Sequence, residues 1–246
     1  MKNAKRFFEV CQQQMAKSLE QEEAIDQAAE MIAESMADGG VLHVFGGGHS
    51  QMFGEELCYR TGCLVPVNAI LVPQYAIYPD IRLCQIMERL ENTADKCLEG
   101  FVTKPQDIML IVSISGRNPA GIDMAIAAHK KGMKVIALTS LDYTNKYASR
   151  HSSGLKLKDV SDLVLDACGI EGDAVLEDER LPEGVRFASP STIVGMHLLI
   201  GIMAEVVDRL LDRGVDPEIW VSGNVDHGDE WNSKYLEKYR GRIDIL

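Results

Sequence analysis

Positive charge is scarce in this 246-residue sequence, which has 25 lysines and arginines against 37 aspartates and glutamates. The formal net charge is −12. General binding to nucleic acids or to anionic membranes requires clustered positive charge, so the composition argues against both kinds of partner. A small anionic ligand remains compatible with it, provided that hydroxyl groups and backbone N–H groups bind that ligand locally.

Long apolar segments and paired cysteines are missing as well. The longest apolar run, residues 193–207, is interrupted by glycine, histidine and glutamate and is too short to span a bilayer. No apolar stretch follows the basic start of the chain, so we expect no signal peptide. The six cysteines form no C-x-x-C pair, which gives no indication of a zinc site. These features predict a cytoplasmic protein with reduced cysteines.

Short apolar runs alternate with amphipathic stretches, which is typical of an α/β fold. We expect helices within residues 1–40 and at 49–61, 81–98, 120–131, 191–211 and 231–240, strands at 41–45, 64–67, 108–112, 133–138 and 163–165, and a long loop at 139–159. The segment 108–138 is a βαβ unit, which requires a parallel sheet. The sequence therefore predicts a three-layer αβα sandwich around a parallel sheet.

The chain is expected to form one domain of residues 1–246. It divides into an N-terminal helical extension (1–40), a sheet core (41–212) and a C-terminal tail (213–246), which together are within the usual size of a domain. Amphipathic extensions need a surface to cover. We therefore expect the N-terminal helices and the tail, with Trp220 and Trp231, to pack on a second subunit in a homodimer or homotetramer.

Two turns at predicted strand ends carry groups that can bind an anion. The first, residues 46–50, reads Gly-Gly-Gly-His-Ser, and its glycines allow a ligand to approach the backbone at a helix N-terminus. The second, residues 113–116, reads Ser-Ile-Ser-Gly and adds two hydroxyl groups. Neither matches the nucleotide-binding P-loop. Each alone is compatible with a tight turn or a helix cap, but two at one sheet edge indicate a ligand site.

The order and spacing of these motifs resemble the sugar isomerase (SIS) domain family. The segments that carry the resemblance are 44–50, 111–116 and 130–139. It is strongest to the phosphoheptose isomerases and their less characterised relatives, and it extends from Ala4 to Leu211. The resemblance implies a flavodoxin-like sandwich that binds phosphorylated sugars as a dimer or tetramer. We predict no cofactor and no metal, because the acidic segment around Asp173 is expected to be solvated surface.

Carried over to this sequence, the phosphate-binding hydroxyls of the family fall on Ser50, Ser113 and Ser115. Phosphoheptose isomerases have a further serine or threonine where this chain has Asn118, preceded by Arg117. The substrate-binding residues that we predict are Gly47, Gly48, Ser50, Ser113, Ser115, Gly116, Arg117 and Asn118.

Isomerisation of an aldose and a ketose needs a base beside the carbonyl carbon. Glu56 is preferred over Glu55, because Glu56 lies nearer the apolar stripe of its predicted helix. The resemblance agrees, since Glu56 and Leu57 look like the Glu-Leu pair of the phosphoheptose isomerase catalytic helix. The alternative is that Glu56 forms a surface ion pair with Arg60.

A second group must move protons between the oxygens of the sugar, and histidine is the natural choice. His49 lies inside the glycine turn, and His197 lies on the long C-terminal helix where phosphoheptose isomerases carry their catalytic histidine. His151, in a polar loop, is a further candidate.

These residues predict a cytoplasmic aldose–ketose isomerase that acts on a sugar phosphate. Two other functions stay open. One is a non-catalytic phosphosugar sensor that regulates a partner, and the other is a lyase or etherase that acts on an amino-sugar phosphate.

Overall fold

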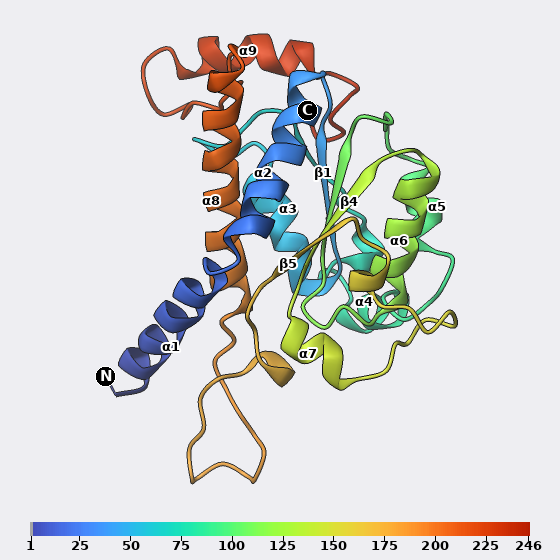
Figure 1. The fold of residues 1–246 in the computed structure, drawn as a ribbon, viewed down its shortest axis with the longest axis vertical. Helices are drawn as coiled ribbons and strands as arrows, with labels where there is room; N and C mark the ends of the chain where they lie inside the picture. Colours follow the sequence, from blue (N-terminus) through green and yellow to red (C-terminus); the bar gives the residue numbers. More distant parts are fainter. Residues whose placement is uncertain (1) are drawn as a thin grey trace.

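A five-stranded parallel sheet forms the centre of the computed structural model, which describes residues 2–246 (Figure 1). Its strands are β1 (Leu42–Gly46), β2 (Val67–Ala69), β3 (Ile108–Val112), β4 (Lys134–Thr139) and β5 (Leu163–Asp166). They lie in the order β2-β1-β3-β4-β5, and all neighbours run parallel. This is the flavodoxin-like order. The predicted parallel sheet of an α/β sandwich is confirmed.

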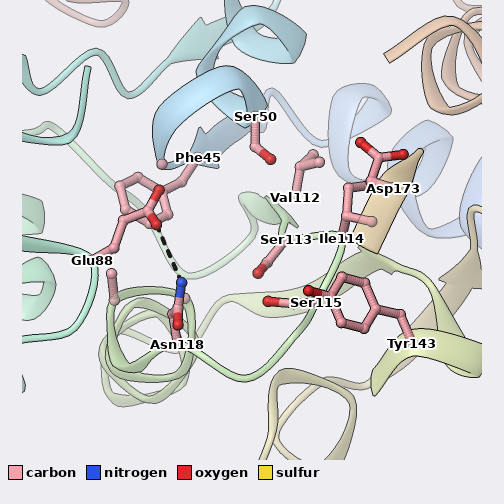
Figure 2. A pocket seen from close by; sticks show the side chains of 13 residues that line it. Phe45, Ser50, Glu88, Val112, Ser113, Ile114, Ser115, Asn118, Tyr143 and Asp173 are labelled. Atoms are coloured by element: carbon pink, nitrogen blue, oxygen red, sulfur yellow. Dashed lines mark hydrogen bonds between the residues drawn. The ribbon is translucent and has the colours of Figure 1, made fainter. Parts of the chain in front are cut away.

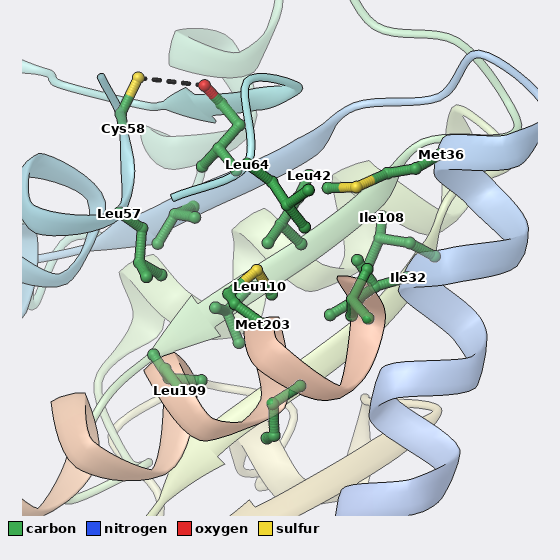
Figure 3. Packing of buried hydrophobic residues seen from close by; sticks show 14 of the residues in the cluster. Ile32, Met36, Leu42, Leu57, Cys58, Leu64, Ile108, Leu110, Leu199 and Met203 are labelled. Atoms are coloured by element: carbon green, nitrogen blue, oxygen red, sulfur yellow. Dashed lines mark hydrogen bonds between the residues drawn. The ribbon is translucent and has the colours of Figure 1, made fainter. Parts of the chain in front are cut away.

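Helices cover both faces of the sheet, which explains why β1 and β3 are buried along their whole length (Figure 1). On one face lie α2 (Glu22–Ala37), α3 (Met52–Leu57) and α8 (Ser191–Asp212), and on the other lie α5 (Ala94–Leu98) and α6 (Pro119–Lys130). Because side chains alternate along a strand, Leu110 packs toward the first group and its neighbour Met109 toward the second. Figure 3 shows Met203 of α8 beside Leu110 and Ile32 of α2 beside Ile108.

The expected elements near β1 differ from the observed ones in length and position. The second strand is β2 instead of a strand at 64–67. The helix expected at 49–61 consists of a 3-10 turn, η1 (Gly48–Gln51), and the short helix α3. This helix ends at Leu57, because Cys58 is extended and Tyr59 adopts a left-handed φ of 54°.

Two further elements were predicted only in part. The helix expected at 81–98 is divided into α4 (Ile81–Met87) and α5, with Asn92 in a left-handed conformation between them. Asp80 is the N-cap of α4 and accepts the backbone N–H of Arg82 at 2.9 Å. The expected loop 139–159 contains α7 (Leu141–Lys146), which Ser140 caps by accepting the N–H of Tyr143. In the described part of the chain, no helix is long and apolar enough to cross a membrane.

The C-terminal tail packs on its own chain. Trp220 is 2% exposed and joins the core beside α8, where Tyr235 of α9 (Gly228–Lys238) contacts it edge to face at 6.0 Å between ring centroids. The expectation that Trp220 faces a second subunit is therefore wrong, because the tail completes the core of its own fold. Trp231, 45% exposed, and Phe8 of α1 (Lys2–Ser18), 59% exposed, remain on the surface. The predicted homodimer or homotetramer stays a prediction.

A buried polar network joins this tail to the amino-terminal edge of the sheet. Asp107 is fully buried and accepts hydrogen bonds from His43 Nε2 at 3.1 Å, from Arg242 and from two backbone N–H groups. Asn68 on β2 donates to Asp244 at 3.0 Å. Burial alone raises the pKa of Asp107, but these hydrogen bonds outweigh burial and hold the pKa at about 2. The network lies at the edge opposite to the carboxyl ends of the strands.

Candidate functional site

A cavity of about 220 Å³ opens at the carboxyl ends of β1 and β3 (Figure 2). The order of strands reverses between β1 and β3, and open parallel sheets bind ligands at such a point. The polar side chains that line the cavity are Ser50, Glu88, Ser113, Ser115, Asn118, Tyr143 and Asp173. The fold therefore brings both predicted turns to one cavity.

The turn between β3 and α6 supplies unpaired donors to this cavity. The hydroxyl groups of Ser113 and Ser115 point into it, and neither makes a hydrogen bond within residues 2–246 (Figure 2). The backbone N–H groups of Ser115, Arg117 and Asn118 also have no acceptor among the described residues. Asn118 is the N-cap of α6. This turn has the donors that an oxyanion requires.

Close packing fixes the shape of the turn at Gly116. Its φ is +60°, and a Cβ atom there would lie 2.5 Å from Thr144 Oγ1 and 2.7 Å from Thr139 Oγ1. Thr144 Oγ1 in turn donates to the carbonyl of Ser115 at 2.6 Å. A side chain at position 116 would therefore displace the group that holds Ser115 in place.

We expect Gly116→Ala to lower the free energy of unfolding by about 1–3 kcal/mol, through backbone strain and steric crowding. Urea denaturation measures this loss. Gly154→Ala is the matched control, because Gly154 also has a positive φ but has open space around it. A loss at Gly116 no larger than the loss at Gly154 would contradict the role of Thr139 and Thr144.

The first turn contributes Gly47 and Ser50 to the cavity wall. A Cβ atom on Gly47 would lie 2.6 Å from Glu88 Oε1, so the glycine lets this carboxyl group approach the turn. The hydroxyl of Ser50 makes no hydrogen bond among the described residues and points toward the cavity (Figure 2). His49, between them, is exposed and does not line the cavity.

Glu88, directly after α4, is one of two carboxyl groups of the cavity that the sequence analysis did not predict there. Burial is the main cause of its raised pKa, and the charges of Arg89 and Arg150 and a hydrogen bond from Asn118 oppose that effect. Asn118 Nδ2 donates to Glu88 Oε2 at 3.2 Å, as Figure 2 shows. No cation of the described chain forms an ion pair with Glu88 within 4 Å. A carboxyl group in this setting can accept and return a proton.

Tyr143 and Asp173 also line the cavity without having been predicted there. Tyr143 lies on α7, in a segment that was expected to be a loop. Asp173 was expected to be solvated surface, but it is partly buried and accepts hydrogen bonds from Ser191 at 2.6 Å and from Ser189. Within residues 2–246, no three His, Cys, Asp or Glu side chains are placed to hold a metal ion.

The predicted binding residues divide into two groups. Gly47, Ser50, Ser113, Ser115 and Asn118 line the cavity, whereas Gly48, Gly116 and Arg117 belong to the two turns without lining it. The first group supplies the groups that face a ligand, and the second fixes the course of the backbone.

The predicted acid–base residues lie outside the cavity. Glu56 forms a partly exposed ion pair with Arg60 at 3.0 Å, which is the alternative weighed for it above. His49 and His197 are exposed. His151 is bound to Asp123, at 3.1 Å between Nε2 and Oδ1. The structure of a single chain does not bring Glu56, His49 and His197 into the cavity. Their catalytic roles therefore stay predictions.

Residues 6–140 match the family described as SIS domain. A UPF0309 protein of Geobacillus kaustophilus is 38% identical over 222 residues, which cover 90% of this chain and 88% of the relative. The chain belongs to the SIS domain family. The resemblance that the two turns predicted is thus confirmed.

Solved structures show the SIS fold at lower identity. A phosphoheptose isomerase from Francisella tularensis superposes with a TM-score of 0.52 at 20% identity, covering 85% of this chain and 96% of that chain. For a phosphoheptose isomerase from Neisseria gonorrhoeae the TM-score is 0.51 at 16% identity, with 83% and 98% covered. These likenesses extend to the fold, and the chemistry of this SIS domain has to be argued from its own cavity.

Proposed function

We propose that this SIS domain binds a sugar phosphate in the cavity and interconverts its aldose and ketose forms. One observation carries the proposal. Unpaired hydroxyl groups from two strand ends share a single cavity with Glu88, a partly buried carboxyl group that has no cationic partner within 4 Å. The hydroxyl groups can bind a phosphate ester, and the carboxyl group can accept and return a proton.

The phosphate group is assigned to the turn between β3 and α6. The hydroxyls of Ser113 and Ser115 and the unpaired N–H groups of the turn converge there, at the N-terminus of the twelve-residue helix α6. The positive end of a helix dipole and unpaired donors stabilise an anion without a lysine or arginine in the cavity wall. An acidic protein can therefore hold a phosphate at this position.

Glu88, in place of Glu56, is the proposed base. Its carboxylate removes the proton from the carbon beside the carbonyl, the electron pair of that C–H bond forms a C=C bond, and the π pair of the carbonyl moves to its oxygen, which gives an enediolate. The resulting carboxylic acid returns the proton to the neighbouring carbon, while a proton passes between the two sugar oxygens. The hydroxyl of Ser50, across the cavity from Glu88, is placed to hydrogen-bond to one of these oxygens (Figure 2).

The double variant Ser113→Ala/Ser115→Ala is expected to raise the Kd for sugar phosphates at least tenfold, because two donors to the phosphate are lost. Isothermal titration calorimetry with pentose, hexose and amino-sugar phosphates measures this change. Ser233→Ala, an exposed position on α9, is the control and should leave the Kd within twofold. Unchanged affinity in the double variant would place the phosphate elsewhere.

A screen of the same sugar phosphates in D₂O tests the reaction itself. We expect at least one of them to yield its isomer and to incorporate deuterium at the carbon that Glu88 deprotonates, as followed by NMR. Binding without isomer or deuterium would contradict an isomerase and favour a sensor. Release of a substituent from an amino-sugar phosphate would instead favour a lyase or etherase.

A further inference from the structure

Two arginines without ion-pair partners, Arg117 and Arg150, lie beside Asn118, and a third, Arg89, is near enough for its charge to act on Arg150. Arg89 directly follows Glu88, Arg117 lies in the phosphate turn, and Arg150 lies in the loop after α7. Most arginines of the described chain pair with a carboxylate, as do Arg60, Arg82, Arg180, Arg186, Arg209, Arg213, Arg240 and Arg242. In a protein with a net charge of −12, unpaired arginines at one place require an explanation.

Hydrogen bonds connect this arginine cluster to the cavity. Arg150 Nη1 donates to Asn118 Oδ1 at 2.9 Å, and the other end of the same amide donates to Glu88. The backbone N–H of Arg150 donates to the carbonyl of Arg117 at 2.9 Å. The guanidinium of Arg117 lies over the ring of Tyr147 at 5.1 Å, and its buried Nε has no acceptor among the described residues.

The loop that carries Arg150 is held in place on its far side. His151 Nε2 lies 3.1 Å from Asp123 Oδ1 on α6. The backbone N–H and the hydroxyl of Ser152 both donate to Glu91, each at 2.6 Å. These contacts hold the loop in place, and the loop in turn holds Arg150 beside Asn118.

Like charges are close together here, and no carboxylate of the described residues forms an ion pair with them, although the charge of Glu88 partly offsets their repulsion at Arg150. Burial first, and then the positive charges of Arg117 and Arg89, lower the pKa of Arg150. Such repulsion is relieved when an anion binds between the guanidinium groups. The planar fork of arginine suits a carboxylate or a phosphate in particular.

We propose that Arg89, Arg117 and Arg150 bind a second anionic group of the substrate, a carboxylate or a second phosphate. This inference rests on the proposed function. The first phosphate already has the hydroxyl groups of Ser113 and Ser115, toward the Tyr143 side of the cavity, whereas the side chains of Asn118 and Glu88 lie on the other side (Figure 2). A substrate that spans the cavity would place its second anionic group by the arginine cluster.

Calorimetric titration with matched ligands tests this inference. The probes are glucose 6-phosphate and fructose 6-phosphate, each with one anionic group, and 6-phosphogluconate and fructose 1,6-bisphosphate, each with two. We expect the ligands with two anionic groups to bind at least tenfold more tightly. The carboxylate and the bisphosphate then distinguish which anion the cluster prefers.

Substitutions of arginine test whether the cluster causes the tighter binding of ligands with two anionic groups. Arg150→Gln should remove most of the advantage of the two-anion ligands, while the Kd of the monophosphates changes less than threefold. Arg82→Gln, whose side chain on α4 is 88% exposed, is the control and should leave all values within twofold.

The outcomes separate this inference from the proposed function. Equal affinity for the two classes of ligand, or an equal loss for both in Arg150→Gln, would overturn the second anionic site and leave phosphate binding intact. If neither class binds and no other sugar phosphate of the screen binds either, the proposed function fails together with the inference. In that case the Ser113→Ala/Ser115→Ala variant would likewise show no change.

Discussion

Glu88→Gln is expected to lower kcat by about 10²–10⁴-fold, because glutamine cannot take up the proton that the carboxylate removes. Binding should change less than threefold, since glutamine retains the size of the side chain and an oxygen that accepts the hydrogen bond from Asn118. Steady-state kinetics on a substrate from the screen, together with the melting temperature of the variant, measures both effects. A loss confined to kcat is the signature of a group that acts on the reacting atoms.

Glu56→Gln is the matched comparison for this experiment. Glu56 is partly exposed in its ion pair with Arg60, and a surface pair of this kind contributes little to stability. Its kcat should therefore stay within about threefold of the wild-type value. Loss of turnover in Glu56→Gln with full activity in Glu88→Gln would return the base to Glu56, as the sequence predicted.

The pH dependence of the reaction provides a further readout of Glu88. Burial raises the pKa of its carboxyl group above the ordinary value of 4.5. The acidic limb of kcat/KM should accordingly have its midpoint above that value, and Glu88→Gln should remove this limb. A limb that persists in the variant would belong to another group.

Asp107→Asn is expected to lower the free energy of unfolding by about 3–5 kcal/mol, because it leaves the Arg242 guanidinium and the donors around it without their buried anion. Urea denaturation measures the loss. Asp208→Asn is the control, since Asp208 is exposed on α8 and should change stability by less than about 0.5 kcal/mol. A loss below about 1 kcal/mol at Asp107 would contradict the structural role of the network.

The low pKa of Asp107 also determines how the stability of the fold changes with pH. Its folded-state pKa of about 2 lies below the ordinary 3.8, so the charged form is favoured by folding. The corresponding stability, about 2 kcal/mol, is fully present above pH 3.8 and is lost as the pH falls toward 2. Asp107→Asn should show a smaller loss across this interval than the wild type. An equal slope in both proteins would exclude Asp107 as its source.

The sequence predicted those parts of the fold and site that depend on local pattern. The apolar run 108–112, the polar turn after it and the amphipathic stretch that follows specify a βαβ unit by themselves, and this brought Ser113 and Ser115 to a strand end. Ser50 followed from the same logic at the end of β1. These residues share the cavity because parallel strands end at one edge of the sheet.

The carboxyl group of the site could not be predicted from local pattern. Glu88 faces the cavity because the chain turns after α4 and its backbone carbonyl accepts the N–H of Ala120 on α6, a contact between segments distant in sequence. The sequence has helical periodicity through 81–98, and Asn92 is not a strong signal for the end of a helix. The break between α4 and α5 was therefore not predicted. Glu56 was favoured because it lies near the apolar stripe of its helix, but its carboxylate is instead partly exposed in an ion pair with Arg60.

The most direct test of a phosphosugar site in this cavity is calorimetric titration of the wild-type protein with pairs of ligands that differ only in the phosphate group. Glucose 6-phosphate with glucose, and fructose 6-phosphate with fructose, are such pairs, and amino-sugar pairs extend the set. We predict that at least one phosphorylated sugar binds with a Kd at least a hundredfold below that of its free sugar. Equal binding within every pair, or no binding of any phosphorylated sugar, would contradict the proposed function.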